Sequence, residues 1–457
     1  MSQIAKRFIV ALNAVLFLAV FLCFGRFITA RPASASLALD VAADTPVVES
    51  GAARRVVVRA LLCPKPAGTA QAKRAPIALA IVLDKSGSML NGAKMENAKK
   101  GAMRALDFLG QRDAASVVVY DDEARVLVPP GPALREDFAR AVGNVRPGGS
   151  TALYAGVETG AQSIARYVNE GYVPRVLLLS DGLANVGPSS SGELAELGRR
   201  FAAREITITT IGVGLDYNED LMTALAAESG GNSYFARNAS SLPEIFARDM
   251  EDASSLSARH VTVTLVCGGE SVPIKSLGRA GSMGGKSIST LIGNVYGEEK
   301  YALFEVEIPS RNGGSPLEAA FVSVEYEDAL TGRRHKIESP LSLRFTADGG
   351  EALKNRRADI AEQAEIARNA EVREEAVRLA DEGRIADASS LLRSRAEEMK
   401  SAAAEAPFPA PLMQSEAEAL RSLADEVETN GAMSNEQRKE TVNKAYIQKN
   451  QQSDVVE

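Results

Sequence analysis

The chain has 457 residues, of which 45% are hydrophobic, so it can bury several cores and is too apolar to be largely disordered. There are 52 Lys and Arg against 59 Asp and Glu, and no basic block stands out, which sets nucleic acid aside as a partner. Aromatic residues make up 5% and Trp is absent, which favours helices packed closely on a sheet over an aromatic sugar-binding surface.

Residues 1–35 predict export. Lys6 and Arg7 precede an apolar run over residues 8–24, and an A-x-A cleavage pattern ends at Ala35. The run is longer than most signal cores and close to the length of a spanning helix, so two alternatives stay open. Either the segment is a cleaved signal, or it remains as an inner-membrane anchor. In both cases the expected location is periplasmic or extracellular, and membrane contact is expected only through this segment.

Residues 37–75, which come next, have the alternating character of β-strands, and residues 76–254 then alternate short apolar runs with helical periodicities. The runs IALAIVLD, ASVVVYD, VLLLSD and ITITTIGVG are bounded by polar turns, as expected of strands buried on both faces. Between them, apolar residues recur at three- and four-residue steps, as in Met95, Ala98, Ala102, Leu106 and Leu109. This pattern predicts an α/β domain with a doubly wound, mostly parallel, Rossmann-like sheet.

Residues 255–346 resemble the 37–75 segment, with strand patterns punctuated by Gly, Pro and Asn. We therefore expect an antiparallel β-sandwich into which the α/β domain is inserted. Cys63 and Cys267 each close one of these strands, and in an oxidising compartment they predict neighbouring strands joined by a disulfide. The alternative is two unrelated buried thiols.

The last part of the chain is rich in Ala, Glu, Arg and Leu, which predicts an α-helical region over residues 350–430. One pair of helices separated by a Gly turn, EEAVRLADEGRIADASSLLRSRAEE, resembles a tetratricopeptide hairpin. Residues 431–457 are polar and rich in Asn and Gln, so they are expected to form a disordered tail or a frayed helix.

Five oxygen-bearing side chains are expected at one edge of the predicted sheet. Asp84, Ser86 and Ser88 follow its first strand, and Thr151 and Asp181 lie in later loops that reach the same edge. Each residue alone fits a helix cap or a turn. Together they form a hard ligand set that suits Mg²⁺ or Mn²⁺ better than Ca²⁺.

The DxSxS run followed by a later Thr and a still later Asp resembles the metal-ion-dependent adhesion site of von Willebrand factor type A domains. The resemblance covers about 180 residues, and it implies that all five side chains serve the metal, directly or through water. It also implies that a Glu or Asp carboxylate of a protein partner completes the coordination. The wider arrangement is similar to bacterial proteins of the inter-alpha-trypsin-inhibitor-like kind.

The expected function is therefore metal-dependent, adhesion-type protein binding in the cell envelope. An alternative that uses the same site is a scaffold that helps to assemble a membrane complex. A hydrolase has less support, because neither of the two histidines, His260 and His335, lies near a nucleophile signature. The chain is accordingly not expected to be an enzyme.

Overall fold

The computed structural model describes residues 36–65, 74–312, 316–405 and 410–452. The described residues from Leu37 onward belong to one compact unit. The predicted export segment, residues 1–35, lies outside the described residues. Within the described ranges, no helix is both long enough and apolar enough to cross a membrane.

The centre of the α/β domain is a six-stranded sheet in the order β6-β5-β4-β7-β8-β9. Its strands are β4 (Ile77–Asp84), β5 (Ala114–Tyr120), β6 (Ala124–Pro132), β7 (Val173–Ser180), β8 (Thr207–Val213) and β9 (Ser233–Ala236). All neighbouring pairs are parallel except β5 and β6, which form an antiparallel edge. The predicted mostly parallel sheet is confirmed, and every residue of β4, β5, β7 and β8 is buried, as their unbroken apolar runs require.

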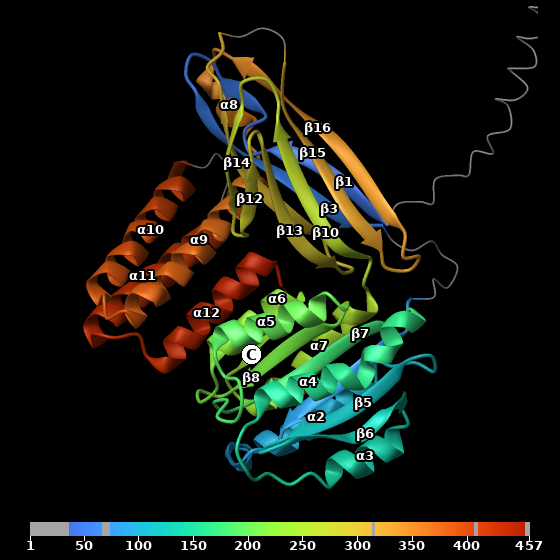
Figure 1. The fold of residues 1–457 in the computed structure, drawn as a ribbon. Coiled ribbons are helices and arrows are strands. Elements are labelled where there is room, and N and C mark those ends of the chain that lie inside the picture. Colours follow the sequence, from blue (N-terminus) through green and yellow to red (C-terminus); the bar gives the residue numbers. More distant parts are fainter. Residues whose placement is uncertain (1–35, 66–73, 313–315, 406–409, 453–457) are drawn as a thin grey trace, which may run out of the picture. The chain divides into compact units, whose positions relative to one another are not determined.

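Helices cover both faces of this sheet (Figure 1). The α-helices are α2 (Lys94–Leu106), α3 (Arg135–Gly143), α4 (Leu153–Ile164), α5 (Ser191–Ala202), α6 (Glu219–Ser229) and α7 (Leu242–Ser254). Short 3-10 turns are η1 (Gly87–Leu90), η2 (Ala165–Glu170) and η3 (Ala239–Ser241). Alternate residues of β4 face opposite ways: Leu79 and Ile81 pack with α2 and α7, whereas Ala80 and Val82 pack with α4 and α5.

The strands that precede the α/β domain in the sequence and those that follow it combine in two further sheets. The strands are β1 (Leu37–Ala43), β2 (Val47–Glu49), β3 (Arg54–Pro64), β10 (Ala258–Cys267), β11 (Val272–Leu277), β12 (Gly281–Gly284), β13 (Ser287–Val295), β14 (Lys300–Ile308), β15 (Leu317–Asp328) and β16 (Arg334–Thr346). The sheet orders are β1-β3-β14-β11 and β12-β13-β10-β15-β16-β2. Pairing is antiparallel except between β2 and β16, which are parallel over three residue pairs. At this edge the sheet departs from the expected antiparallel pairing.

The predicted disulfide is also wrong in this structure, because both cysteines are free thiols. Cys63 lies on β3, whose neighbours are β1 and β14, and Cys267 lies on β10, whose neighbours are β13 and β15. β3 runs toward the α/β domain and β10 runs away from it, so the carboxyl ends of the two strands lie at opposite ends of the sheets. A ten-residue strand such as β10 is roughly 30 Å long, whereas a disulfide needs Cα atoms less than about 7 Å apart.

The C-terminal region is helical, as predicted. Its helices are α8 (Gly349–Lys354), α9 (Ala358–Asp381), α10 (Ile385–Glu405), α11 (Pro411–Asn430) and α12 (Asn435–Asn450). A shared core of Ala, Leu and Met side chains holds α9, α10 and α11 together, including Leu392, Met399 and Leu420.

Helix α12 differs from the expected disordered or frayed tail. It begins with a capping box in which Ser434 and Gln437 bond each other's backbone, and it contacts α9, α6 and β9 (Figure 1). Its side chain Lys439 is buried and pairs with Glu219 of α6. The polar composition therefore reflects ion pairing with other elements and not a solvated tail.

Candidate metal centre

The five predicted oxygen donors converge at the carboxyl edge of the central sheet. Asp84 is the last residue of β4, Ser88 lies in the turn η1, and Asp181 directly follows β7. Thr151 stands just before α4. The two carboxylates are fully buried, and Ser86 and Thr151 are nearly so, so the fold holds these polar groups inside although they lie at a strand end and in loops.

Hydrogen bonds connect four of the donors in a row. The Ser86 backbone N–H donates to Asp84 Oδ1 at 2.8 Å, and the hydroxyls of Ser86 and Ser88 share a hydrogen bond of 2.9 Å. The Ser88 hydroxyl then donates to Asp181 Oδ1 at 2.6 Å. These side chains lie close enough to serve a single ion.

The fifth donor, Thr151, joins the group through Gly182. A Cβ at Gly182 would lie 3.2 Å from Ser88 Oγ and 3.5 Å from Thr151 Oγ1, so both hydroxyls border the same small space. The Thr151 loop is fixed by Asn185, whose side chain accepts from the Thr151 N–H at 2.7 Å. A residue larger than glycine after Asp181 would crowd the two hydroxyls.

Two further residues hold the carboxylate of Asp84. The Ser180 hydroxyl donates to Asp84 Oδ2 at 2.8 Å, and the Tyr120 hydroxyl approaches the same oxygen at 3.3 Å. Burial raises the pKa of Asp84, and the charge of Asp181 adds to that rise. A divalent cation would relieve this repulsion, and all five donors are hard oxygens, so the residues fit Mg²⁺ or Mn²⁺.

Lys94 occupies the other side of Asp181. Its ammonium group donates to Asp181 Oδ2 at 2.7 Å, while Ser88 uses Oδ1. Lys94 is the first residue of α2 and was not among the predicted site residues. The only sequence feature that could have indicated a role for Lys94 is its position, ten residues after Asp84 and directly before the helical pattern that starts at Met95.

The loops that carry the donors are joined through their backbones. The Gly87 N–H donates to the Gly149 carbonyl at 3.0 Å, and the Gly148 N–H donates to the Lys85 carbonyl at 2.7 Å. The Lys85 side chain pairs with Asp121. Gly149 has a φ of +84°, and a Cβ there would lie 2.8 Å from Asp122 Oδ2, so only glycine fits this turn.

The centre has just two carboxylates. Within the described part of the chain, no group of three or more His, Cys, Asp and Glu side chains could hold a metal ion, so the hydroxyls are essential to the donor set. Of the histidines, His335 lies on β16 and stacks on Tyr326 at 5.3 Å between ring centroids. His260 lies on β10.

Comparison with known proteins identifies the α/β domain. Residues 78–248 match the family model of the von Willebrand factor type A domain. A solved von Willebrand factor type A protein from Catenulispora acidiphila shares the fold, with a TM-score of 0.60, 18% identity, and coverage of 85% of this chain and 96% of that one. The chain therefore contains a von Willebrand factor type A domain, a class that generally mediates protein–protein interactions.

Three curated relatives show how far the sequence likeness extends. An uncharacterized protein from Synechocystis sp. is 28% identical over 195 residues, which is 42% of this chain and 45% of that protein. The E3 ubiquitin-protein ligase WAV3 of Arabidopsis thaliana is 26% identical over 331 residues, or 68% of this chain and 41% of that protein. Inter-alpha-trypsin inhibitor heavy chain H3 of Bos taurus is 26% identical over 165 residues, or 34% of this chain and 18% of that protein. The chain thus spans less than half the length of each relative.

Proposed function

We propose that this chain is a metal-dependent protein-binding module of the cell envelope. The observation that carries the proposal is the connected set of Asp84, Ser86, Ser88 and Asp181, with Thr151 beside it. In this proposal the five side chains hold Mg²⁺ or Mn²⁺ at the edge of the sheet. The ion, when bound, supplies a positive charge that an acidic side chain of a partner can contact.

Charge at the site supports an anionic partner. Asp84 and Asp181 carry two negative charges, and Lys94 contributes one positive charge beside them. Adding a divalent ion leaves one net positive charge, which a Glu or Asp carboxylate of the partner would balance. The amino-terminal ends of α2 and α4 begin close to these donors and favour negative charge at the same place.

The remaining parts are proposed as support for this site. We divide the chain into an export segment, residues 1–35, a von Willebrand factor type A domain, residues 76–254, and a helical region. The segments 37–75 and 255–346 form, in this proposal, a β-sandwich into which the α/β domain is inserted, because β3 pairs along its length with β14. Export to the periplasm or the cell surface follows from the sequence of the first segment.

Capture from an envelope extract tests the proposal. The immobilised chain is exposed to the extract with Mg²⁺ or with EDTA, in parallel with a Thr151→Ala variant. A matched control is Ser163→Ala, which removes a hydroxyl that only bonds within and beside α4. A partner retained only with Mg²⁺, lost with Thr151→Ala and lost after its carboxylates are amidated supports the proposal. Retention of the partner that is unchanged by EDTA and by Thr151→Ala contradicts the proposal.

A further inference from the structure

A cavity of about 180 Å³ lies at the end of the central sheet opposite the metal centre. It is lined by the amino-terminal ends of β7 and β8, by parts of β13 and by the end of α12. Residues of the α/β domain, the flanking sheets and the C-terminal helix therefore meet around one space. Arg279, Lys300, Tyr296, Asn294, Tyr446 and Asn450 are among its lining residues.

Arg279 brings an uncompensated charge to this cavity. Its Nε is buried and has no hydrogen-bond partner, and no ion pair to its guanidinium occurs within the described residues. Burial lowers the pKa of Arg279 to about 10, still far above neutral pH, so the group stays charged. A half-buried cation whose Nε has no partner is costly, and an anion in the cavity would remove that cost.

Lys300 adds a second positive charge. Its ammonium group donates to the backbone carbonyls of Asn450 at 2.7 Å and Gln451 at 2.5 Å, which are neutral acceptors. Burial, and then the nearby charge of Arg279, lower the pKa of Lys300 to about 8. An anion between the two groups would favour both charged forms.

The carboxylates that line the cavity are engaged with other arginines. Glu205 pairs with Arg259 at 2.9 Å, and Glu228 pairs with Arg199 at 3.3 Å. Neither therefore neutralises Arg279. Across the described ranges, no carboxylate forms an ion pair with Arg279 or Lys300.

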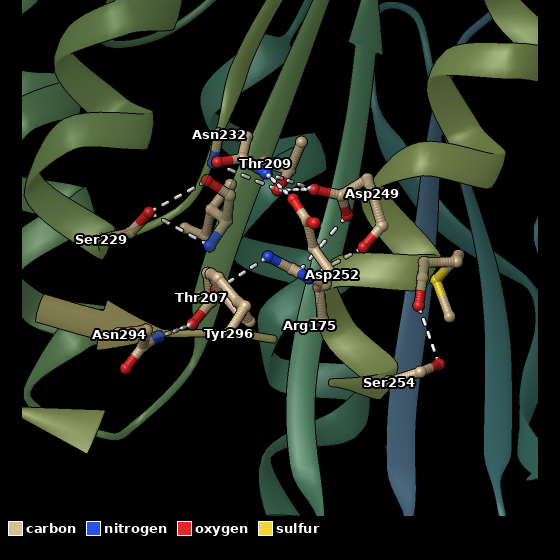
Figure 2. Close-up of polar contacts among 12 residues, drawn as sticks. Arg175, Thr207, Thr209, Ser229, Asn232, Asp249, Asp252, Ser254, Asn294 and Tyr296 are labelled. Carbon is tan, nitrogen blue, oxygen red and sulfur yellow. Dashed lines mark hydrogen bonds and ion pairs between the residues drawn. The ribbon is translucent and has the colours of Figure 1, made fainter. Parts of the chain in front are cut away.

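Neutral groups on the cavity wall are held in place by a buried network (Figure 2). Arg175 ion-pairs with Asp249 at 3.3 Å and donates to the Tyr296 hydroxyl at 3.0 Å. Because that hydroxyl oxygen accepts from Arg175, its own hydrogen can point to the cavity. Asn294, beside it, donates to Thr207 at 3.3 Å.

We propose that this cavity binds one small oxyanion of the phosphate type, held by Arg279 and Lys300 with the Tyr296 hydroxyl as an additional donor. The volume suffices for a single such ion with a few waters, since one water takes about 30 Å³ of liquid volume. Because the lining residues come from three parts of the chain, the bound ion ties these parts together. This inference is independent of the metal site.

Calorimetric titration of inorganic phosphate into the chain tests the proposal, in metal-free buffer with chloride at equal ionic strength as the reference. One equivalent of phosphate is expected to bind, with affinity falling on the order of 10- to 100-fold in Arg279→Gln, as for the loss of a charge-assisted hydrogen bond. Arg334→Gln, an exposed arginine on β16, is the matched control and should bind as the parent does.

Thermal unfolding without phosphate separates binding from a merely structural role. Removing this half-buried, unpaired charge should leave the melting temperature of Arg279→Gln unchanged or raise it, whereas phosphate should stabilise only the parent and the control. Should Arg279→Gln fail to fold, Lys300→Gln provides the same comparison. No saturable binding by the parent, or equal binding by the parent and both variants, would overturn the proposal.

Discussion

Asp84, a proposed metal ligand, is a buried carboxylate with both oxygens hydrogen-bonded. Its Oδ1 accepts from the Ser86 backbone, and its Oδ2 is held by Ser180 and Tyr120. These bonds fix the orientation of a group whose pKa burial raises. In the proposed metal centre, Ser180 and Tyr120 would therefore influence metal affinity without contacting the ion.

Ser180→Ala should weaken Mg²⁺ binding roughly tenfold, because second-shell hydrogen bonds orient metal ligands and their loss costs about 10- to 100-fold. Calorimetry measures the affinity. Ser116→Ala on β5 removes another buried strand hydroxyl, which donates to the Val128 carbonyl far from the site, and serves as the control. Equal Mg²⁺ affinities for the two variants would show that Ser180 does not position Asp84.

Lys94→Met should bind Mg²⁺ about tenfold more tightly, because the ammonium group 2.7 Å from Asp181 repels a second cation. Lys100→Met, an exposed lysine on the same helix, should leave the affinity unchanged. The same titrations provide the measurement. Weaker binding by Lys94→Met would mean that Lys94 serves chiefly to orient the Asp181 carboxylate.

The sequence could predict that the five side chains gather at one edge of the sheet. Asp84, Ser86 and Ser88 lie at the end of β4, Asp181 follows β7, and Thr151 lies in a loop that reaches the same edge. It could not predict Ser180 or Lys94 as site residues. Ser180 ends an apolar strand like many small polar residues, and Lys94 starts an amphipathic helix that a lysine would fit without any role. Ser180 contacts Asp84, and Lys94 contacts Asp181, across the edge of the sheet. A local sequence pattern does not predict such contacts.

At the scale of elements, α12 is attached to the α/β domain by buried charges. Lys439 donates to the Tyr217 carbonyl at 2.6 Å and pairs with Glu219, and Arg438 donates to Asp220 at 2.8 Å. Tyr446 donates to the Gly231 carbonyl at 2.8 Å. The sequence of residues 434–457 shows no amphipathic periodicity, so it does not predict that α12 packs against the α/β domain.

Lys439→Met should lower the free energy of unfolding by about 3 kcal/mol, because it leaves Glu219 buried with only Arg438 as a counter-ion. Urea unfolding at neutral pH measures the change. Lys336→Met, whose side chain is half exposed and pairs with Glu338 on the surface, should change stability by less than about 0.5 kcal/mol. Similar losses for both variants would contradict a buried role for Lys439.

The α9–α11–α12 contact should depend on pH through Glu416. Burial alone would raise the pKa of Glu416, but Arg373 at 2.8 Å and Lys444 at 2.7 Å outweigh it and lower the pKa to about 2. The carboxylate therefore contributes stability above its unfolded pKa of 4.5, and this contribution is lost as pH falls from 4.5 toward 2.

The whole shift corresponds to at most about 3 kcal/mol. Urea midpoints measured between pH 7 and pH 3 should fall more steeply for the parent than for Glu416→Gln, which cannot titrate. Parallel curves for the two proteins would show that Glu416 is not stabilised in its charged form.

At the scale of the whole chain, the two proposed sites lie at opposite ends of the same sheet. The metal donors stand at the carboxyl ends of β4 and β7, whereas the anion cavity stands at the amino ends of β7 and β8. Arg175 near the start of β7 is buried against α7 and Tyr296, so the far end of the sheet is fixed to the flanking strands (Figure 2).

The alternation of strand and helix patterns predicted the α/β domain. The similar strand patterns of residues 37–75 and 255–346 predicted that these two segments form one β domain. The pairing of β3 with β14 agrees with that expectation. The predicted disulfide is wrong although Cys63 and Cys267 lie at similar positions, each near the end of its strand. Strands that enter and leave the same domain run in opposite directions, so similar ends are far apart.

The most direct test of the central proposal is calorimetric titration of Mg²⁺ and Mn²⁺ into the metal-stripped chain. The parent and the control Asp137→Asn, an exposed carboxylate on α3, should bind one ion. Asp84→Asn and Asp181→Asn should lose about 100-fold or more in affinity while remaining folded, because each removes a charged ligand. Absence of binding by the parent, or unchanged binding by both site variants, would contradict a metal centre at Asp84, Ser86, Ser88, Thr151 and Asp181.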